Sequence, residues 1–503
     1  MSKAKEILLI APPISLSQKR NISYSPPLGL AYLAAVARKE GYKVNCLDAL
    51  IEGYEKGPRC VDDGTRRLFH YGLTLNEISR IIEKTKPEII SLSCSFTIVW
   101  GNTVALSKTI KELDPDIKVV IGGAHPSAVP LGCLADTVDF VIIGEGEKTF
   151  LELINHLNHN SPSDLTSIRG IAFSQKGQPI ITPPRAPITN LDELPFPARE
   201  LLPLEKYIKA GKDGKAHVPV KRDRYMTVIT SRGCPGRCIF CSIHCVWGRS
   251  WRARSPDNVV AELEELVSHF GISEIHFEDD SISLDKRRLL KICDLIVDRN
   301  LDISWTTPNG VRINTLDKEI LRKMKQSGCY QLNFGIESGN EYVRNSIIKK
   351  PINNDQVAGV LQTCKELGIW TMGFFVIGLP GETIEMMHDS FNYAKKMNFD
   401  NAGFFIATPY PGTELFEVAQ SKGYLPHNID LTECMFPSAM LSTEDFSNDD
   451  VLKLQHNFSK DFAIYRLKKE IDPISIIKRL SQLRSYEDLR FLLAKARVIR
   501  FFT

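Results

Sequence analysis

The segment "SRGCPGRCIFCSIHCVWGRSW" (residues 231–251) gathers several cysteines in a stretch that also contains glycine, proline and tryptophan. The cysteines are Cys234, Cys238, Cys241 and Cys245. Glycine and proline prevent helix formation, so the segment is predicted to be a loop that can wrap around a bound object. Such a loop can carry disulfides, a zinc ion or an iron–sulfur cluster, and the sequence around it narrows the choice.

The composition argues against disulfides. The chain has 503 residues, 43% hydrophobic and 24% charged, and its net charge of +3 does not indicate a nucleic-acid partner. The N-terminal "MSKAKEILLIAPP" holds too short an apolar run for a secretion signal, and no run approaches the roughly 18 apolar residues that span a bilayer. We therefore predict a cytoplasmic protein without a transmembrane segment, whose twelve cysteines stay reduced.

Residues 1–155 are predicted to form a doubly wound α/β domain of the Rossmann-like, flavodoxin-like type. Short apolar runs such as "EILLIAP", "EIISLSCS" and "KVVIGGA" alternate with amphipathic stretches such as "GLAYLAAVARKEG". Strands that are apolar on both faces indicate a parallel sheet covered by helices on both sides. Ligands of such sheets bind beyond the carboxyl ends of the strands, where small residues such as Gly122 and Gly144 allow close approach. The alternative is that these glycines only form tight turns.

A second α/β unit is predicted further along the chain. Residues 156–220 accumulate proline and are predicted to be an irregular connection. Residues 221–425 contain six strand-plus-helix units, which predicts a partial (β/α)6 barrel of the TIM type, with its active site after the strands. Residues 426–503 are predicted to be a helical extension. From Leu452 on it has a surplus of Lys and Arg, which is interpreted as a solvated face; contact with an anionic substrate, partner or membrane surface is the alternative.

The cysteine loop follows the first strand of this barrel. Cys234, Cys238 and Cys241 have C-x-x-x-C-x-x-C spacing, without the second cysteine pair that structural zinc sites use. Three thiolates on one loop can bind three irons of a [4Fe-4S] cluster and leave the fourth iron open. If Cys245 also bound, the site would be a closed four-cysteine zinc or electron-transfer site, and the loop alone leaves that alternative open.

In this context the sequence resembles the radical S-adenosylmethionine (SAM) enzymes, whose signature is this cysteine spacing with an aromatic residue before the last cysteine. The resemblance implies that the cluster ligands are Cys234, Cys238 and Cys241. Four later strand ends, "HFEDD", "TPNGVR", "FGIESGN" and "VIGLPGET", resemble the family's SAM contacts. By this resemblance the SAM-binding residues are Phe240, Asp279, Asp280, Asn309, Glu337, Ser338 and Gly378, with Glu278 beside the first aspartate.

The N-terminal domain resembles the cobalamin-binding domain of one subgroup of these enzymes, through "SPPLGLAYLAAV", "GGAHPS" and "GEGEKTF". The resemblance implies cobalamin contacts at Leu28, Gly29, Ser93, Gly122, Gly123, His125, Gly144 and Glu145. The Asp-x-His-x-x-Gly motif that supplies an axial histidine in other cobalamin domains is absent, so the cobalt is expected to lack a histidine ligand. A degenerate domain that binds no corrinoid is the alternative.

The resemblance as a whole implies an anaerobic enzyme that uses a [4Fe-4S] cluster, SAM and cobalamin. An electron from an external donor such as flavodoxin or ferredoxin would cleave SAM to a 5′-deoxyadenosyl radical that abstracts hydrogen from an unactivated carbon. The expected function is methyl transfer to carbon, or less often phosphorus, of a small-molecule substrate. The alternatives are an oxidative cyclase or rearrangement enzyme of the anaerobic tetrapyrrole type, and a non-catalytic iron–sulfur protein. Cys434, predicted in a loop near the barrel mouth, is a further functional candidate.

Overall fold

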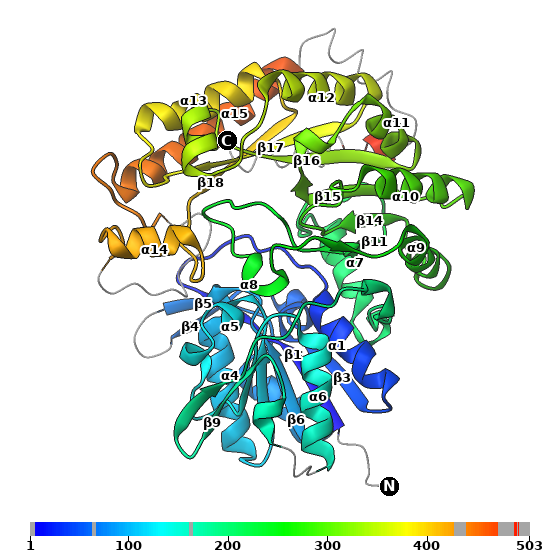
Figure 1. Cartoon of the computed structure of the whole chain (residues 1–503), viewed down its shortest axis with the longest axis vertical. Helices are drawn as coiled ribbons and strands as arrows, with labels where there is room; N and C mark the ends of the chain where they lie inside the picture. Colours follow the sequence, from blue (N-terminus) through cyan, green and yellow to red (C-terminus); the bar gives the residue numbers. More distant parts are fainter. Residues whose placement is uncertain are drawn as a thin grey trace.

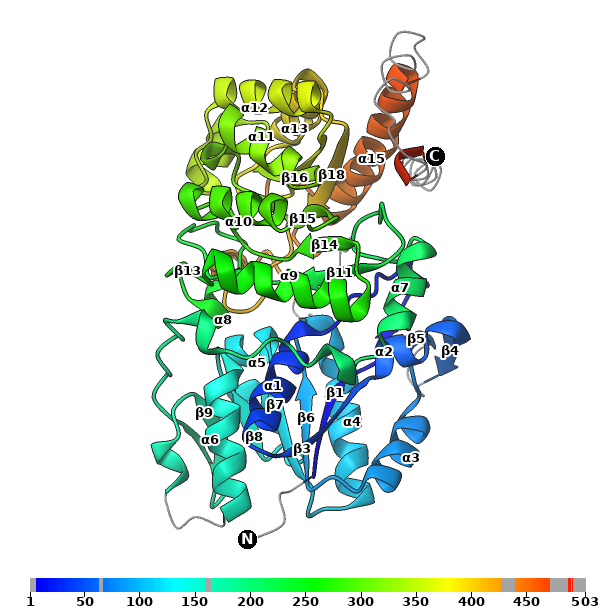
Figure 2. The ribbon, with the colours of Figure 1, turned by 90° about the vertical axis from the view of Figure 1, so that its right-hand side faces the viewer.

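Two α/β domains are stacked along the long axis of the molecule, and the cysteine loop with the short helix α8 (His244–Trp247) lies where they meet (Figures 1 and 2). The computed structural model describes residues 6–62, 67–159, 164–426, 439–470, 487–489 and 491. Within that part of the chain, no helix is long and apolar enough to cross a membrane.

The N-terminal domain is built on a seven-stranded sheet with the order β10-β9-β8-β7-β6-β1-β3. Its strands are β1 (Glu6–Ala11), β3 (Lys43–Asp48), β6 (Ile89–Ser93), β7 (Lys118–Gly122), β8 (Phe140–Ile142), β9 (Ile171–Gln175) and β10 (Gln178–Ile181). The first five are parallel in the order β3-β1-β6-β7-β8, which is the flavodoxin-like order. The predicted doubly wound fold is therefore confirmed, and its ligand crevice is expected beyond the carboxyl ends of β1 and β6, where the strand order reverses.

Helices cover both faces of this sheet because successive strand residues point to opposite sides. In β1, Ile7 and Leu9 pack with α1 (Leu28–Lys39) and α6 (Gly146–His159). Leu8 and Ile10 of the same strand pack instead against the other face. The helices on that face are α3 (Leu75–Thr85) and α4 (Trp100–Leu113).

The connection predicted to be irregular contains regular structure. β9 and β10 form an antiparallel hairpin on the edge of the N-terminal sheet. Its two turn residues, Lys176 (φ 52°) and Gly177 (φ 76°), both have the positive φ of a tight hairpin turn. A second small sheet joins β2 (Ile14–Leu16), β5 (Arg67–Tyr71) and β4 (Arg59–Asp62). The hairpin and this small sheet extend the domain beyond its five parallel strands.

The second domain is a parallel sheet of six strands whose spatial order follows the sequence, with β11 and β18 at its edges. The strands are β11 (Tyr225–Val228), β14 (Glu274–Phe277), β15 (Ser304–Val311), β16 (Cys329–Glu337), β17 (Trp370–Ile377) and β18 (Asn401–Ile406). The helices that follow the first five strands are α9 (Pro256–Phe270), α10 (Lys286–Asp298), α11 (Lys318–Gln326), α12 (Asn354–Leu367) and α13 (Ile384–Lys396). Their apolar faces and the outer face of the sheet form one large core.

Two further helices lie at the β18 edge. α14 (Glu414–Ser421) follows β18, and α15 (Asn448–Glu470) packs along the same strand, with Phe458 and Phe462 against Phe404. α15 agrees with the predicted helical extension over the part of it that is described. Cys434 and all of the Lys and Arg residues after α15 lie outside the described residues.

Candidate active site

The backbone holds the cysteine loop at several points. The loop starts after β12 (Ser231–Arg232), which pairs with β13 (Arg252–Ala253). Gly233 has φ 84°, and a Cβ there would lie 2.4 Å from the Ser250 carbonyl oxygen, so only glycine fits. In the middle of the loop, the Ile239 carbonyl accepts a hydrogen bond of 2.9 Å from Leu415 N at the start of α14. The loop is therefore tied both to its own hairpin and to the far edge of the barrel.

The thiols of this loop lie close to one another. A Cβ on Gly236 would lie 3.3 Å from Cys234 Sγ and 3.9 Å from Cys238 Sγ, so these two thiols point to the same side of the loop. Burial raises the pKa of Cys241 to about 12, with a further contribution from Cys234 and Cys238, and a bound cation would be needed to hold its thiolate. Three neighbouring cysteines are the ligand set that a [4Fe-4S] cluster uses.

Cys245 is turned away from the other three cysteines. It lies in α8, and its Sγ donates to the Gly412 carbonyl oxygen at 3.6 Å. Gly412 also faces Ala128 of α5 (Ala124–Ala128) in the N-terminal domain. This position favours three cluster ligands and gives Cys245 a place at the domain interface.

Two basic side chains close to the cysteines were missed by the sequence analysis. Arg312 Nη1 lies 4.0 Å from Cys234 Sγ. The Lys350 ammonium lies close enough to Cys238 to oppose the rise that burial causes in that thiol's pKa, and its Nζ donates to Glu337 Oε1 at 2.6 Å. Both can balance the negative charge of thiolates. No spacing in the sequence connects them to the loop, since they follow the third and fourth barrel strands.

The two aspartates of "HFEDD" have different surroundings. Asp279 is 2% exposed and accepts hydrogen bonds from Thr230 N, Thr230 Oγ1 and Ser231 Oγ, the last at 2.5 Å. It therefore supports the base of the cysteine loop. Asp280 is half-buried beside Gly233 N, and burial with the charge of Asp279 raises its pKa to about 7. Asp280 thus has a backbone partner, whereas Asp279 is bonded to the side chains of Thr230 and Ser231.

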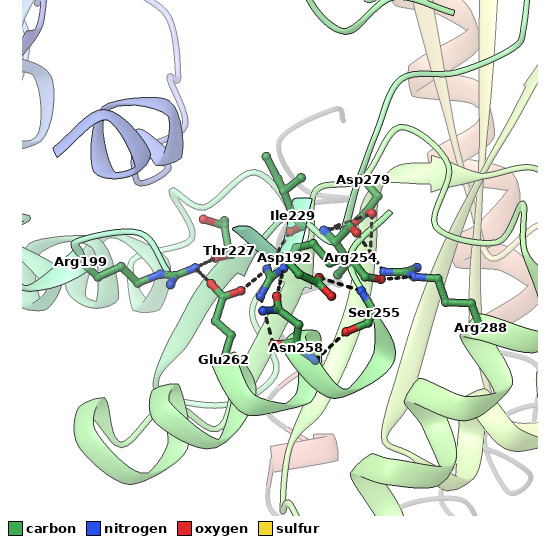
Figure 3. A network of polar contacts seen from close by, with 11 residues as sticks. Asp192, Arg199, Thr227, Ile229, Arg254, Ser255, Asn258, Glu262, Asp279 and Arg288 are labelled. Atoms are coloured by element: carbon green, nitrogen blue, oxygen red, sulfur yellow. Dashed lines mark hydrogen bonds and ion pairs between the residues drawn. The ribbon is translucent and has the colours of Figure 1, made fainter. Parts of the chain in front are cut away.

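A buried network of charged residues surrounds the segment to which Asp279 is hydrogen-bonded (Figure 3). Arg288 donates to the Thr230 carbonyl oxygen at 2.9 Å and to the Arg254 carbonyl oxygen at 2.7 Å. The Arg254 guanidinium contacts Glu262 of α9, which also meets Arg199 Nη2 at 2.6 Å. Arg199 belongs to the interdomain connection, so this network joins the connection to the strand end that carries the cluster loop.

The remaining predicted SAM residues lie at the carboxyl ends of the barrel strands. Asn309 is exposed, and its Nδ2 donates to the Glu278 carbonyl oxygen at 2.9 Å. Glu337 has a left-handed backbone with φ 69°, a strained conformation that often marks functional sites. Gly378 has φ 83° and donates its N–H to Glu382 at 2.8 Å.

Ser338 and Phe240 are placed differently from these residues. Ser338 is fully buried, and its hydroxyl faces Ser390 of α13 at 3.2 Å. Its backbone N–H donates to the Ile336 carbonyl oxygen at 2.9 Å, and its carbonyl oxygen accepts from Arg344 Nη1 at 3.1 Å. Phe240 packs against the hydrophobic core of the barrel domain. The assignment of these side chains to SAM contact stays a prediction.

The carboxyl edge of the N-terminal sheet has the small residues that a large planar ligand needs. Ser93 ends β6, and Phe96 beyond it is 70% exposed. Gly123 has φ 125°, and a Cβ there would lie 2.6 Å from the Cys94 carbonyl oxygen. A Cβ on Gly122 would meet only Ile142, and one on Gly29 would meet nothing within 4 Å, so neither position is crowded. These residues fit a corrinoid lying between the two domains.

Histidine ligation of the cobalt is not favoured by the side-chain contacts. His125 is buried, its Nδ1 lies 3.1 Å from Thr97 Oγ1, and its ring packs on Trp100. His70 has both ring nitrogens in hydrogen bonds, with Ser15 Oγ and the Leu73 carbonyl oxygen. The contacts of His70 occupy both ring nitrogens, whereas the hydrogen bond of His125 involves Nδ1, so the absence of a histidine ligand on the cobalt stays a prediction.

Glu145 and Leu28, both predicted to contact cobalamin, are buried. The Glu145 carboxylate accepts from Ile188 N at 2.9 Å and meets Arg252 Nη2 at 2.5 Å. Its side chain is therefore engaged with the barrel domain. Leu28 is the first residue of α1 and packs inward. For both, cobalamin contact remains a prediction.

A cavity of about 1290 Å³ lies at the opposite end of the barrel. Residues where the strands begin line it, including Ser304, Cys329 and Trp370. Active sites of such barrels lie at the carboxyl ends of the strands, so this cavity is not the site of the chemistry.

Comparison with known proteins agrees with both domains. Residues 23–154 match the B12 binding domain family, and residues 228–394 match the Radical SAM superfamily. Two solved structures share the fold. OxsB with aqua-cobalamin and SAM bound has a TM-score of 0.68 at 18% identity, covering 98% of this chain and 72% of that chain. TsrM from Kitasatospora setae with tryptophan and a SAM analogue bound has a TM-score of 0.65 at 19% identity, covering 84% and 77%.

The protein is thus a radical SAM enzyme with a cobalamin-binding domain, and its cofactors are a [4Fe-4S] cluster, SAM and cobalamin. Within that family it is similar to an uncharacterized methyltransferase of Pyrococcus horikoshii, at 35% identity over 92% of this chain and 90% of the relative. The cytidylyl-2-hydroxyethylphosphonate methyltransferase of Streptomyces wedmorensis is 31% identical over 92% and 90%. The anaerobic magnesium-protoporphyrin IX monomethyl ester cyclase of Rubrivivax gelatinosus is 26% identical over 82% and 70%. The chain belongs to the cobalamin-dependent radical SAM family.

Proposed function

We propose that the enzyme transfers a methyl group from SAM to an unactivated carbon, or to phosphorus, of a small-molecule substrate, with cobalamin as the methyl carrier. The observation that carries this proposal is similarity along nearly the whole chain, at more than 30% identity, to two methyltransferases. One of them is named for a nucleotide-activated phosphonate, which makes that compound a suitable first substrate to test.

The cluster and SAM together supply, when bound, a radical able to abstract hydrogen from an unactivated carbon. The chain's own residues bind and orient these groups. Cys234, Cys238 and Cys241 bind the cluster, while Arg312 and Lys350 offset its negative charge. The stacked domains exclude water from the space between the barrel and the cobalamin edge.

Binding of SAM is assigned to the strand ends around the loop. Asp280 meets the amino group of its methionine part, because this carboxylate has no side-chain partner comparable to those of Asp279. Asn309 and the strained backbone at Glu337 contact its polar atoms. The adenine is assigned to the turn after β17, where Gly378 has φ 83°.

We also propose the division of the chain into a cobalamin domain (1–155), a connection (156–220), a radical SAM domain (221–425) and a helical extension (426–503). An external donor such as flavodoxin or ferredoxin is proposed to supply the electron.

The proposal is tested without knowing the substrate. The full chain is reconstituted anaerobically with iron, sulfide and cobalamin, reduced, and incubated with SAM that carries a deuteromethyl group. Methyl transfer predicts deuteromethylcobalamin together with S-adenosylhomocysteine. Cytidylyl-2-hydroxyethylphosphonate is then added as a probe substrate, and its mass is followed.

A second candidate is an oxidative cyclase, which the similarity to the Rubrivivax protein favours. That function predicts 5′-deoxyadenosine without deuteromethylcobalamin in the same experiment. Formation of neither product would contradict both functions.

A further inference from the structure

An arginine at the start of the cysteine loop contacts the cobalamin domain. Arg232 directly precedes Gly233 and Cys234, but its side chain points into the N-terminal domain. Its Nη2 donates to Glu147 Oε1 at 2.5 Å, and its Nη1 lies 3.8 Å from Glu145 Oε2. The side chain is 3% exposed, so this contact is removed from water.

A second arginine repeats the arrangement. Arg252 lies directly opposite Arg232 in the two-stranded ladder of β12 and β13. Its Nη2 meets Glu145 Oε1 at 2.5 Å, and its Nη1 donates to the Ile188 carbonyl oxygen at 2.6 Å. Two adjacent arginines of the barrel domain therefore meet two carboxylates of one loop in the N-terminal domain.

The two carboxylates lie at the start of α6, at the edge of the N-terminal sheet. Glu145 and Glu147 flank Gly146 at the start of α6, directly after Gly144, whose φ of 78° turns the chain at the end of β8. This is the carboxyl edge of the sheet, where the cobalamin is expected. One end of the ion network thus lies at the cobalamin edge, and its other end lies two residues from Cys234.

Aromatic rings restrict the orientation of Arg232. Its guanidinium lies 4.6 Å from the ring centre of Trp247 in α8 and 5.3 Å from that of Tyr32 in α1. Tyr32 belongs to the N-terminal domain, while Trp247 belongs to the segment that contains the cysteines. Cation–π contact on two rings, together with charge-assisted hydrogen bonds, leaves the guanidinium little freedom to move.

We propose that Arg232, Arg252, Glu145 and Glu147, here called the Arg–Glu latch, are positioning residues that hold the cluster loop at a defined distance and orientation from the cobalamin. Buried ion pairs contribute little net stability compared with well-packed apolar residues, whereas their hydrogen bonds impose direction. This role assumes that the cluster and cobalamin are both bound, and it does not depend on which atom receives the methyl group.

The test measures the separation of the two cofactors. The full chain is reconstituted anaerobically with the cluster and cob(II)alamin, the cluster is reduced, and the magnetic coupling between the two spins is measured by pulsed EPR. The wild type is expected to give a narrow distance distribution. In Arg232→Met the distance distribution is expected to widen about twofold, because the loop loses its directional contacts. In Arg232→Lys the width is expected to lie between those of the wild type and Arg232→Met.

A matched control breaks an exposed interdomain ion pair. Arg38 of α1 contacts Glu200 of the connection, and the two side chains are 44% and 52% exposed. Arg38→Met should leave the distance distribution unchanged, because an exposed ion pair constrains little. An equal widening in this control would overturn the proposal.

A double variant separates positioning from stability. Arg232→Met combined with Glu147→Met replaces the buried ion pair by apolar side chains and should restore thermal stability if Arg232→Met alone is unstable. The latch predicts that the distribution stays wide although stability, iron content and cobalamin content recover. A distribution as narrow as that of the wild type would show that the four residues act only in packing. Because the readout is a distance, it is independent of whether methyl transfer occurs.

Discussion

Arg199 and Glu262 form an ion pair of 2.6 Å in which each side chain is 1% exposed, and it attaches the interdomain connection to the first helix of the barrel (Figure 3). Arg254 contacts the same carboxylate from the other side. A single buried carboxylate therefore pairs with two arginines, and its removal would break both ion pairs.

Glu262→Gln is expected to lower the free energy of unfolding of the barrel domain by about 3 to 5 kcal/mol, the usual cost of removing one member of a buried pair. Chemical denaturation followed by circular dichroism measures it. Glu264→Gln is the matched control on the same helix, because Glu264 is 42% exposed and pairs with Arg299; its expected effect is about 0.5 kcal/mol or less. Equal effects of the two substitutions would contradict the network's role.

Cys238→Ala should abolish the iron–sulfur chromophore, since it removes one of three cluster ligands. Cys245→Ala should retain the chromophore, because its thiol faces Gly412. Iron and sulfide per chain after reconstitution provide the measurement. Loss of iron in both variants would indicate a four-cysteine site instead.

Arg312→Gln is expected to lower the midpoint potential of the cluster by on the order of 50 mV, because a positive charge 4.0 Å from Cys234 Sγ stabilises the reduced, more negative form. An EPR-monitored redox titration determines the shift. Arg237→Gln removes the same charge from an exposed position on the loop and should shift the potential less. A larger shift in this control than in Arg312→Gln would refute the assignment.

Glu382 should make stability depend on pH. Burial raises its pKa from 4.5 to about 8, so the neutral carboxyl is favoured in the folded chain. The contribution of this neutral carboxyl to the free energy of unfolding is complete below pH 4.5. It is lost as the pH rises towards 8, at up to about 1.4 kcal/mol per pH unit, because the unfolded chain ionises first. Glu382→Gln cannot ionise, so its stability relative to the wild type should increase from pH 5 to pH 8. Parallel pH profiles of the two proteins would disprove the shift.

The cob(II)alamin form should lack a histidine ligand. Burial lowers the pKa of His125 to about 4, so its imidazole is neutral, but Thr97 and Trp100 hold the ring in place. EPR spectra of protein grown with ¹⁵N-histidine should therefore match those of unlabelled protein. A change in nitrogen splitting on labelling would identify an axial histidine.

Much of the fold could be predicted because its signals are local. Apolar runs of strand length between amphipathic helices predict both parallel sheets, and Gly378 and Gly123 lie where the chain turns after a strand. The hairpin of β9 and β10 was missed, because a short alternating pattern around Lys176 and Gly177 was obscured by neighbouring prolines. Its lysine-glycine turn was the signal that could have identified it.

The site was predictable only in part, because residues remote in sequence complete it. Asp279 and Asp280 look equivalent in "HFEDD". In the structure Thr230 and Ser231 donate hydrogen bonds to Asp279, whereas Asp280 lies beside Gly233. Arg312 ends the "TPNGVR" motif and Lys350 belongs to no motif, and both meet the cysteines only because the ends of parallel strands converge at one edge.

The sequence by itself determined the two-domain architecture and the three-cysteine spacing, since each depends on periodicity or on spacing within one segment, and its motifs carried the resemblance to the family. Only the tertiary structure decided the separate position of Cys245, the charges around the thiols and the contact of Arg232 with Glu147. The physical reason is that electrostatic contacts depend on distance in space, and chain order does not specify which charged side chains are brought out of water together.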